Sequence, residues 1–220
     1  TVVAIFIMVF LLIWIFISVA KTYKKREGMA PKGMQSAFEP VIVFIRDDIA
    51  VPSIGEKKAY RYMPFLLTIF FFIFLSNIFG LVPLGINITG NIAVTLVLAV
   101  FTFIITTFSG NKNYWKHIFA TPGVPWALLP IMIPIELVGI FTKPFALMIR
   151  LFANMTAGHI IVLSLISIIF INKSEAWGLL SVPMALFISV LEILVAFLQA
   201  YLFASLSALF IGAAVEEDHH

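Results

Sequence analysis

The sequence predicts an all-α integral membrane protein with about five membrane-embedded helices and one amphipathic helix on the membrane surface. Hydrophobic residues make up 62% of its 220 residues, and charged residues only 11%. The uncharged runs are long enough to cross a bilayer, and the charges gather in short segments between them. We therefore expect one membrane domain over 1–220, in which the last two helices form a long, strongly tilted hairpin.

Composition also excludes several kinds of functional site. The chain has no cysteine, which excludes disulfides, thiolate metal sites and cysteine nucleophiles. It lacks the G-x-x-x-x-G-K-[ST] pattern of phosphate-binding loops. The net charge of +3 comes from clusters of Lys and Arg, and no motif for RNA or DNA accompanies them. We expect no catalytic residue, no metal, no cofactor and no nucleic-acid partner.

The distribution of charge predicts the topology. Residues 1–20 are an uncharged run followed at once by a basic cluster, which predicts a first span rather than a signal peptide with its basic start. Residues 62–110 lack charges and are interrupted by turn formers over 81–91, which predicts two more spans. Eleven of the fourteen Lys and Arg residues lie in 21–61 and 111–117. We therefore expect both segments in the cytoplasm and the N-terminus outside.

The cytoplasmic or interfacial segment 21–61 contains an amphipathic stretch. Apolar residues recur there at helical spacing, and three charged residues lie away from them: Val41, Phe44, Ile45 and Ile49 against Arg46, Asp47 and Asp48. The stretch is too short and too charged to span, so we expect a helix on the membrane surface.

Residues 118–215 predict a helical hairpin with its outer turn near residue 174. Its first arm, from about Glu136 to Phe170, has roughly 35 residues, which makes about 50 Å of helix. A hydrocarbon core about 30 Å thick cannot hold that helix upright. The arm must tilt strongly, bend at Pro144 or run partly along the surface. The tail 216–220 is polar and expected in the cytoplasm.

Arg150 lies in the middle of an otherwise apolar run. An arginine at the bilayer centre costs roughly 2.5 to 3.5 kcal/mol, so it normally faces protein or water and has a function. In a regular antiparallel hairpin that turns near residue 174, residues at equal depth have numbers that add to about 350. This rule pairs Arg150 with Gln199 in a deep layer. It pairs His159 with Glu192 in a layer some 10 to 14 Å nearer the outer face.

Small residues follow one face of each arm. In the second arm they recur at every fourth position: Ala196, Ala200, Ala204, Ala208 and Gly212. Around Arg150 the corresponding residues are Ala146, Ala153, Asn154 and Ala157. Such stripes allow another helix or water to approach, although ordinary internal packing would also explain the second-arm stripe. The same rule places Glu136 at about the depth of Ala214, near the cytoplasmic end. Polar groups then lie at an outer, a middle and an inner level, which indicates a route for an ion that is interrupted at its midpoint by a fixed positive charge.

Four segments resemble subunit a of the F-type ATP synthase. They are KPFALMIRLFANMTAGH from Lys143, LEILVAFLQAYLF from Leu191, FEPVIVFIRDD from Phe38 and LSNIFGLVP from Leu75. The resemblance implies a proton-conducting stator subunit with two offset half-channels that is not itself an enzyme. It implies as partners the rotor ring of c subunits, peripheral-stalk b subunits, other ATP synthase subunits, membrane lipid and protons.

The resemblance also implies a set of proton-translocation residues: Arg150, His159, Glu192, Gln199, Asn154 and Glu136. Arg150 would be the essential arginine that faces the rotor carboxylates, and the amide oxygen of Gln199 would orient its guanidinium. His159 and Glu192 would form a coupled pair in the outer half-channel. Asn154 would line the polar path, and Glu136 would serve the cytoplasmic side. Gly80 stands where some members carry Asp, so no role is assigned there.

Alternatives come from the same residues. A secondary transporter would bind an anionic substrate at Arg150, but such proteins usually carry internal repeats, and the two halves here are unlike. A non-conducting scaffold would tolerate replacement of Arg150. An ion pair with Glu192 that serves only the structure would also explain an arginine within the membrane. Asn77 and Ser76 fit either helix contacts or channel lining. The polar tail favours the inner membrane of a bacterial cell, with several spans, over the mitochondrial inner membrane.

Overall fold

The computed structural model describes residues 2–25, 33–81, 88–119, 128–172 and 178–216, and no strand occurs among them. The helices in chain order are α1 (Val2–Lys25), α2 (Met34–Phe44), the π-helical segment η1 (Ile45–Ala50), α3 (Val51–Ile54), α4 (Glu56–Leu81), α5 (Ile92–Phe108), α6 (Lys112–Phe119), α7 (Leu129–Asn172) and α8 (Gly178–Val215). Within the described part, α1, α4, α7 and α8 are long and apolar enough to cross a membrane. The all-helical membrane fold is thereby confirmed, with α5 as a shorter apolar helix of 17 residues.

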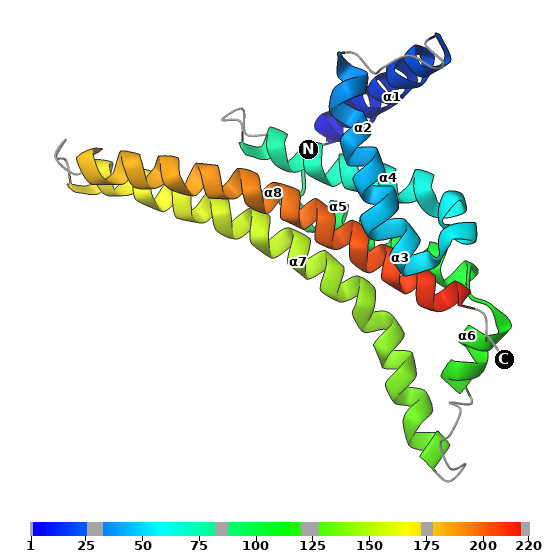
Figure 1. Cartoon of the computed structure of the whole chain (residues 1–220). Helices are drawn as coiled ribbons and strands as arrows, with labels where there is room; N and C mark the ends of the chain where they lie inside the picture. The colour runs from blue at the N-terminus through cyan, green and yellow to red at the C-terminus, as the bar shows by residue number, and fades with distance from the viewer. Residues whose placement is uncertain (1, 26–32, 82–87, 120–127, 173–177, 217–220) are drawn as a thin grey trace.

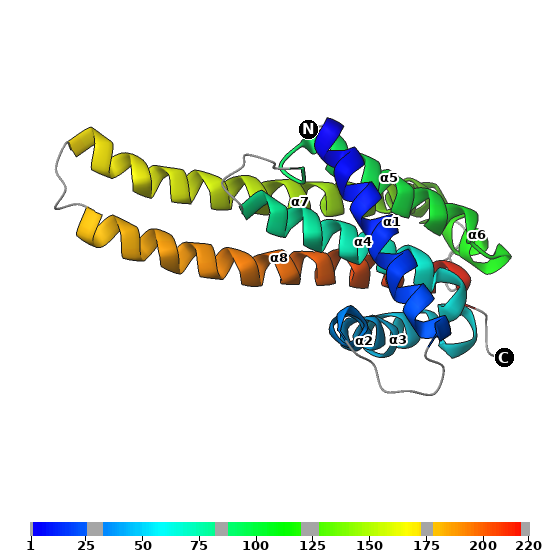
Figure 2. The same ribbon diagram turned by 90° about the horizontal axis from the view of Figure 1, so that it is seen from above.

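Two long helices, α7 and α8, run side by side and form the axis of the molecule (Figure 1). α2 and α3 lie on the α8 side of this pair, and α5 and α6 lie on the α7 side (Figure 2). α4 packs along α8, and α1 contacts α4 and α2. The hairpin is therefore supported by different helices along its two arms.

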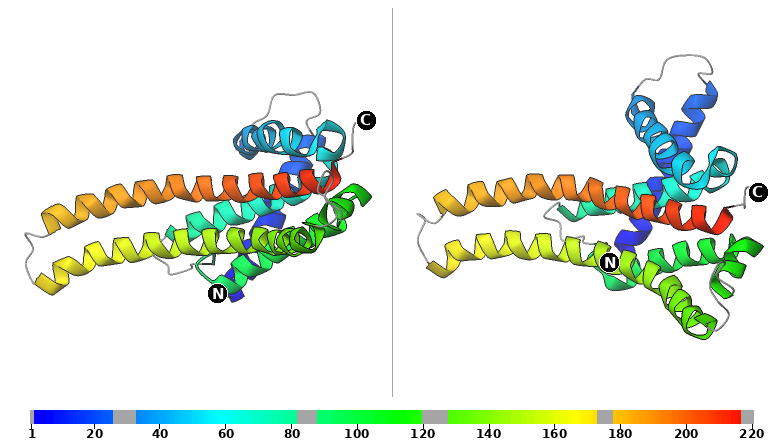
Figure 3. Two further views of the ribbon diagram at one scale, coloured as in Figure 1. Left: turned by 90° about the horizontal axis from the view of Figure 1, so that it is seen from below. Right: turned by 60° about the horizontal axis from the view of Figure 1, so that its bottom comes forward.

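α7 is longer than expected. It has 44 residues, or about 66 Å of helix, and begins at Leu129. Its N-terminal turns swing away from α8 (Figures 1 and 3). Pro134 and Pro144 lie within it, and a proline removes a backbone donor and bends a helix. A bend at Pro144 was one of the three predicted ways in which this long first arm could fit a bilayer, beside a strong tilt and a course along the surface. The predicted turn near residue 174 lies outside the described residues.

The amphipathic stretch forms α2, η1 and α3. Ile45 and Ile49 are fully buried, whereas Asp47 and Asp48 are exposed, as the periodicity predicts. Arg46 and Asp47 form an exposed ion pair, with Nε and Oδ1 2.7 Å apart. The apolar face packs against α4 and α8, so protein rather than lipid covers it.

The small-residue stripe of α8 is buried throughout, from Ala196 to Gly212. At Gly212 the contact is closest, since a Cβ atom added there would collide with the backbone carbonyl of Ser53. The stripe is thus a surface for internal packing against α3, η1 and α4. Internal packing, the alternative stated above, is the correct interpretation for α8.

The C-terminal end of α8 is held by donors from two other segments. Lys58 Nζ donates to the carbonyl of Val215 at 2.7 Å. The backbone N–H of Asn111 donates to Ala214 at 2.9 Å, and its side-chain amide donates to Val215 at 3.0 Å. These bonds satisfy carbonyls that a helix end leaves free, and a cation there is favoured by the helix dipole. One end of the molecule therefore gathers the start of α4, the α5–α6 connection and the end of α8.

We expect Gly212→Ala to lower the stability of the folded protein, because its methyl group would push α3 away from α8. Overpacking of this kind costs about 1 to 3 kcal/mol. Gly139→Ala is the matched control, since an added Cβ meets nothing within 4 Å there, and alanine favours a helix by up to about 1 kcal/mol. Thermal unfolding in detergent should separate the two variants. An equal or higher melting temperature for Gly212→Ala would contradict the packing described.

Candidate functional site

Arg150 lies on the exposed face of α7. Leu147, Leu151 and Met155 are buried against neighbouring helices, whereas Arg150 and its small neighbours are exposed: Ala146, Ala153, Asn154 and Ala157. No hydrogen bond or ion pair joins the guanidinium to another described residue. A structural pair with Glu192 is therefore absent from the described region. The guanidinium is therefore exposed on the surface of the described helices.

Gln199 is 3% exposed and lies at the depth that the hairpin rule predicts. Its Nε2 donates to the carbonyl of Leu151 at 2.6 Å and to that of Arg150 at 3.3 Å. Its Oε1 accepts from Asn77 Nδ2 at 3.1 Å. The expectation that this oxygen orients the guanidinium is wrong for this structure, because the amide contacts the backbone at Arg150 instead.

Asn77 and Thr89 extend this set of hydrogen bonds into α4 and the segment that precedes α5. Both are fully buried, and Thr89 Oγ1 donates to Asn77 Oδ1 at 2.6 Å. Asn77 thus makes contacts between helices, one of the two roles left open for it. Ser76 is also buried, and its hydroxyl has no partner among the described residues. Thr89 lies within a turn, and no periodic pattern in the sequence singles it out.

Glu192 lies against Gly158, the residue before His159. A Cβ atom added to Gly158 would collide with Oε1 at the flexible end of the Glu192 side chain, so the carboxylate in its present position lies directly against this glycine. Glu192 and His159 are close enough to interact electrostatically. His159 Nε2 is buried without a hydrogen-bond partner in the described region. Glu192 and His159 therefore lie near each other on the facing helices, and Gly158 is a neighbour of this pair that sequence reasoning missed.

Glu136 lies near α6 rather than opposite the end of α8. Its carboxylate interacts electrostatically with Tyr114, and the bend in α7 carries this part of the helix away from α8 (Figure 1). The equal-depth rule, which paired it with Ala214, does not describe its surroundings. α6 lies outside the four candidate spans. Burial raises the pKa of the Tyr114 hydroxyl, and the nearby carboxylate raises it further, so this hydroxyl keeps its proton.

The described residues contain no group of three or more His, Cys, Asp or Glu side chains that could hold a metal ion. Arg150 and Gln199 lie at one level of the α7–α8 pair, and His159 and Glu192 lie at a second level. Asn154 shares the exposed face of Arg150, and Glu136 lies apart on the bent end of α7.

Comparison with known proteins gives the family. The sequence model of the family described as ATP synthase A chain matches residues 2–212. The ATP synthase subunit a 2 of Chlorobaculum tepidum is 54% identical over 208 residues, covering 91% of this chain and 58% of that protein. The subunit a 2 of Prosthecochloris aestuarii is 52% identical over 217 residues, covering 96% and 66%.

The ATP synthase subunit a of Anaeromyxobacter sp. is 48% identical over 204 residues, which cover 89% of this chain and 50% of the relative. The chain thus spans between half and two thirds of the length of these curated relatives. The extent of the match and the level of identity together show that this membrane-embedded chain belongs to the ATP synthase subunit a family.

Proposed function

We propose that this chain is the proton-conducting stator subunit of an F-type ATP synthase. The observation that carries the proposal is Arg150, a mid-span arginine exposed among small residues and without an ionic partner in the described region. Desolvated without a counter-charge, such a guanidinium is unfavourable in a membrane. Contact with the carboxylate of a partner that moves past α7 would relieve this cost.

The rotor ring of c subunits is the proposed partner on that face, and each of its subunits would carry one carboxylic acid. This acid must be neutral while it faces lipid, because an ionised carboxylate is too costly there. Near Arg150, positive charge and polar surroundings favour the ionised form. The acid then releases its proton towards one side and takes another from the opposite side. Arginine suits this position because it stays charged even when desolvated.

Two half-channels would deliver these protons. His159 and Glu192 would relay protons on the outer side, since histidine side chains titrate near neutral pH and the carboxylate is adjacent. Glu136 would serve the cytoplasmic side. Asn154 would line the path beside Arg150, and Gln199 would hold the backbone that carries the arginine.

The proposed setting is the inner membrane of a bacterial cell, with the N-terminus outside and the C-terminus in the cytoplasm. The bacterial sources of the relatives support it. Peripheral-stalk b subunits and the other ATP synthase subunits complete the proposed partners. Ion flow between this chain and the ring would drive rotation and ATP synthesis, while the catalytic chemistry belongs to other subunits.

Arg150→Ala should slow ATP-driven proton pumping by about a hundredfold or more, as removal of a preorganised charge or donor does at a reacting site. The measurement is proton uptake by inverted vesicles that contain the whole ATP synthase. Arg61→Ala is a control at another exposed arginine and should pump normally. If the Arg150→Ala complex assembles and pumps as wild type does, a scaffold or an anion transporter becomes the better interpretation.

The exchange of His159→Glu with Glu192→His tests the coupled outer pair. Each single replacement leaves two like groups in one layer, whereas the exchange restores one imidazole and one carboxylate. We expect the double variant to pump faster than either single variant in the same vesicles. A double variant slower than both singles would argue against a coupled relay.

Gly158→Ala tests whether pumping depends on the contact between the Glu192 carboxylate and Gly158. The added methyl group would displace that carboxylate from α7, and a shift of about 1 Å in a reacting group can cost up to about a hundredfold in rate. We expect pumping to fall while the complex still assembles. Gly139→Ala, on the same helix and with open space around the added carbon, should leave pumping unchanged. Equal pumping by both variants would remove Gly158 from the site.

A further inference from the structure

The short helix α6 presents two different faces. Tyr114 and Ile118 lie on its inner face, where Ile118 is 3% exposed and Tyr114 is partly buried. Its outer face spans about 100° of the helix circumference and consists of four exposed residues: Lys112, Trp115, Lys116 and Phe119. None of these four belongs to the site described above.

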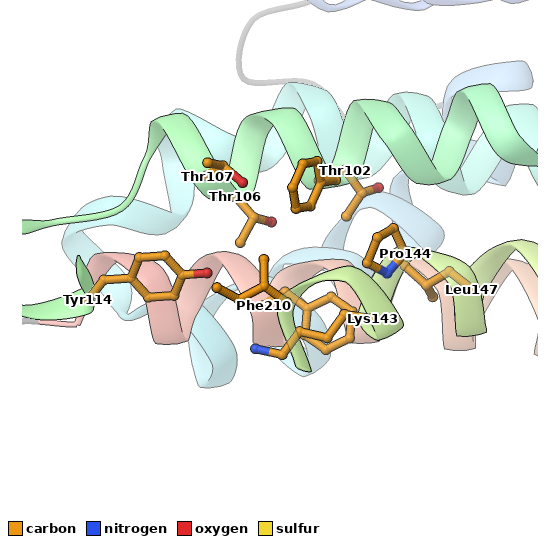
Figure 4. Close-up of a pocket in the computed structure, with 10 residues that line it drawn as sticks. Thr102, Thr106, Thr107, Tyr114, Lys143, Pro144, Leu147 and Phe210 are labelled. Atoms are coloured by element: carbon orange, nitrogen blue, oxygen red, sulfur yellow. The ribbon is translucent and has the colours of Figure 1, made fainter. Parts of the chain in front are cut away.

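The inner face fixes the orientation of α6. Tyr114 lines a small pocket together with side chains from α5, α7 and α8 (Figure 4), and it interacts electrostatically with Glu136. The pocket has a volume of about 10 Å³, which is room for about one water molecule and not for a side chain. Just before the helix, Asn111 donates to the carbonyls of Ala214 and Val215. The outer face therefore cannot turn inward without breaking these contacts.

The outer face combines two large rings with two cations. Trp115 is 38% exposed and Phe119 is 51% exposed, and their rings are stacked with centroids 6.3 Å apart. No ion pair joins Lys112 or Lys116 to another residue of the described chain. Tryptophan is enriched at the level of lipid headgroups, and a lysine can reach a phosphate while its apolar stem lies along hydrocarbon. These residue types on a short helix are typical of a membrane interface.

The position of α6 fits the edge of the bilayer. The apolar helix α5 ends at Phe108, which is 86% exposed, and α6 begins four residues later. On α7, which α6 contacts, the apolar side chains of Ile131, Ile135 and Val138 are 58% to 61% exposed. The outer face of α6 thus begins where exposed apolar surface ends, which is the level of the headgroups.

We propose that the outer face of α6 binds the headgroups of anionic phospholipids, with the ammonium groups of Lys112 and Lys116 on the phosphates and the rings of Trp115 and Phe119 beneath them. Anionic lipids give the cytoplasmic leaflet a negative surface potential, and the distribution of charge predicts that α6 lies on that side. The proposal is independent of the proton route, because Tyr114, the α6 residue near Glu136, lies on the opposite face of the helix.

The test uses whole ATP synthase in vesicles of phosphatidylcholine and phosphatidylglycerol, with a trace of one or the other lipid in photoreactive form. Mass spectrometry of the digested chain measures the label on α6. We expect more label from phosphatidylglycerol, which is anionic. The ratio of the two labels should fall roughly fivefold for each lysine replaced, in Lys112→Gln and in Lys116→Gln, because one lysine near an anionic surface contributes about that factor in affinity.

Two controls isolate the charge of the outer face. The double variant Lys112→Arg with Lys116→Arg keeps both cations and should keep the wild-type ratio. Lys57→Gln, at an exposed lysine of α4, should leave the label on α6 unchanged. Equal labelling of α6 by the two lipids, an unchanged ratio in the double glutamine variant, or an α6 without lipid label because another subunit covers it would each overturn the proposal.

Arg150→Ala, labelled in the same vesicles, separates this proposal from the stator function. It should keep the wild-type ratio of labels, whatever its rate of pumping. Loss of pumping there together with equal labelling by the two lipids in the wild type would remove the lipid site alone. Normal pumping by Arg150→Ala would remove the stator function and leave the lipid site standing.

Discussion

The side-chain amide of Gln199 is the interaction on which the rest of the structure depends. It joins three helices at one depth, because it donates to the backbone of α7 at Arg150 and Leu151 and accepts from Asn77 on α4. Apolar faces gain little from meeting each other in a bilayer, since lipid tails are equally apolar, so packing and interhelical hydrogen bonds provide the specificity. Because both polar atoms of the amide bond to protein, the backbone at Arg150 is held, while its guanidinium has no hydrogen-bond partner among the described residues.

The small residues of α7 and α8 look alike in sequence and act differently. On α8 they let the backbones of α3 and α4 come close, and at Gly212 even one added carbon would collide with Ser53. On α7 they surround Arg150 and are exposed. The small side chains leave the guanidinium accessible on α7, where the larger side chains of Phe145 and Ile149 are exposed as well. In the function proposed above, this face would meet the rotor.

Sequence reasoning predicted the layers where the helices are regular and failed where they are not. Gln199 contacts Leu151 and Glu192 contacts Gly158, two pairs at the predicted depth. The equal-depth rule does not hold for the part of α7 that precedes Pro144. Two prolines bend α7 there, and Glu136 lies near α6 instead of α8. The orientation of the Gln199 amide could not be predicted from the sequence, because its oxygen bonds to Asn77, which lies 122 positions earlier. Gly158 and Thr89 act through contacts that no periodicity signals.

The separation of charges within the chain follows from the same geometry. Glu192 is the carboxylate on α8 that could pair with Arg150, yet it sits against Gly158, some eight residues or about 12 Å further along α7. Nearer to Arg150, the matching position on α8 holds Gln199, which is neutral and fully used by other bonds. Replacing that amide with a carboxylate would bring a negative charge to the arginine and cancel the field that a passing acid would meet. A neutral residue that is bonded elsewhere is therefore what keeps an intramembrane arginine both anchored and unpaired within the described chain.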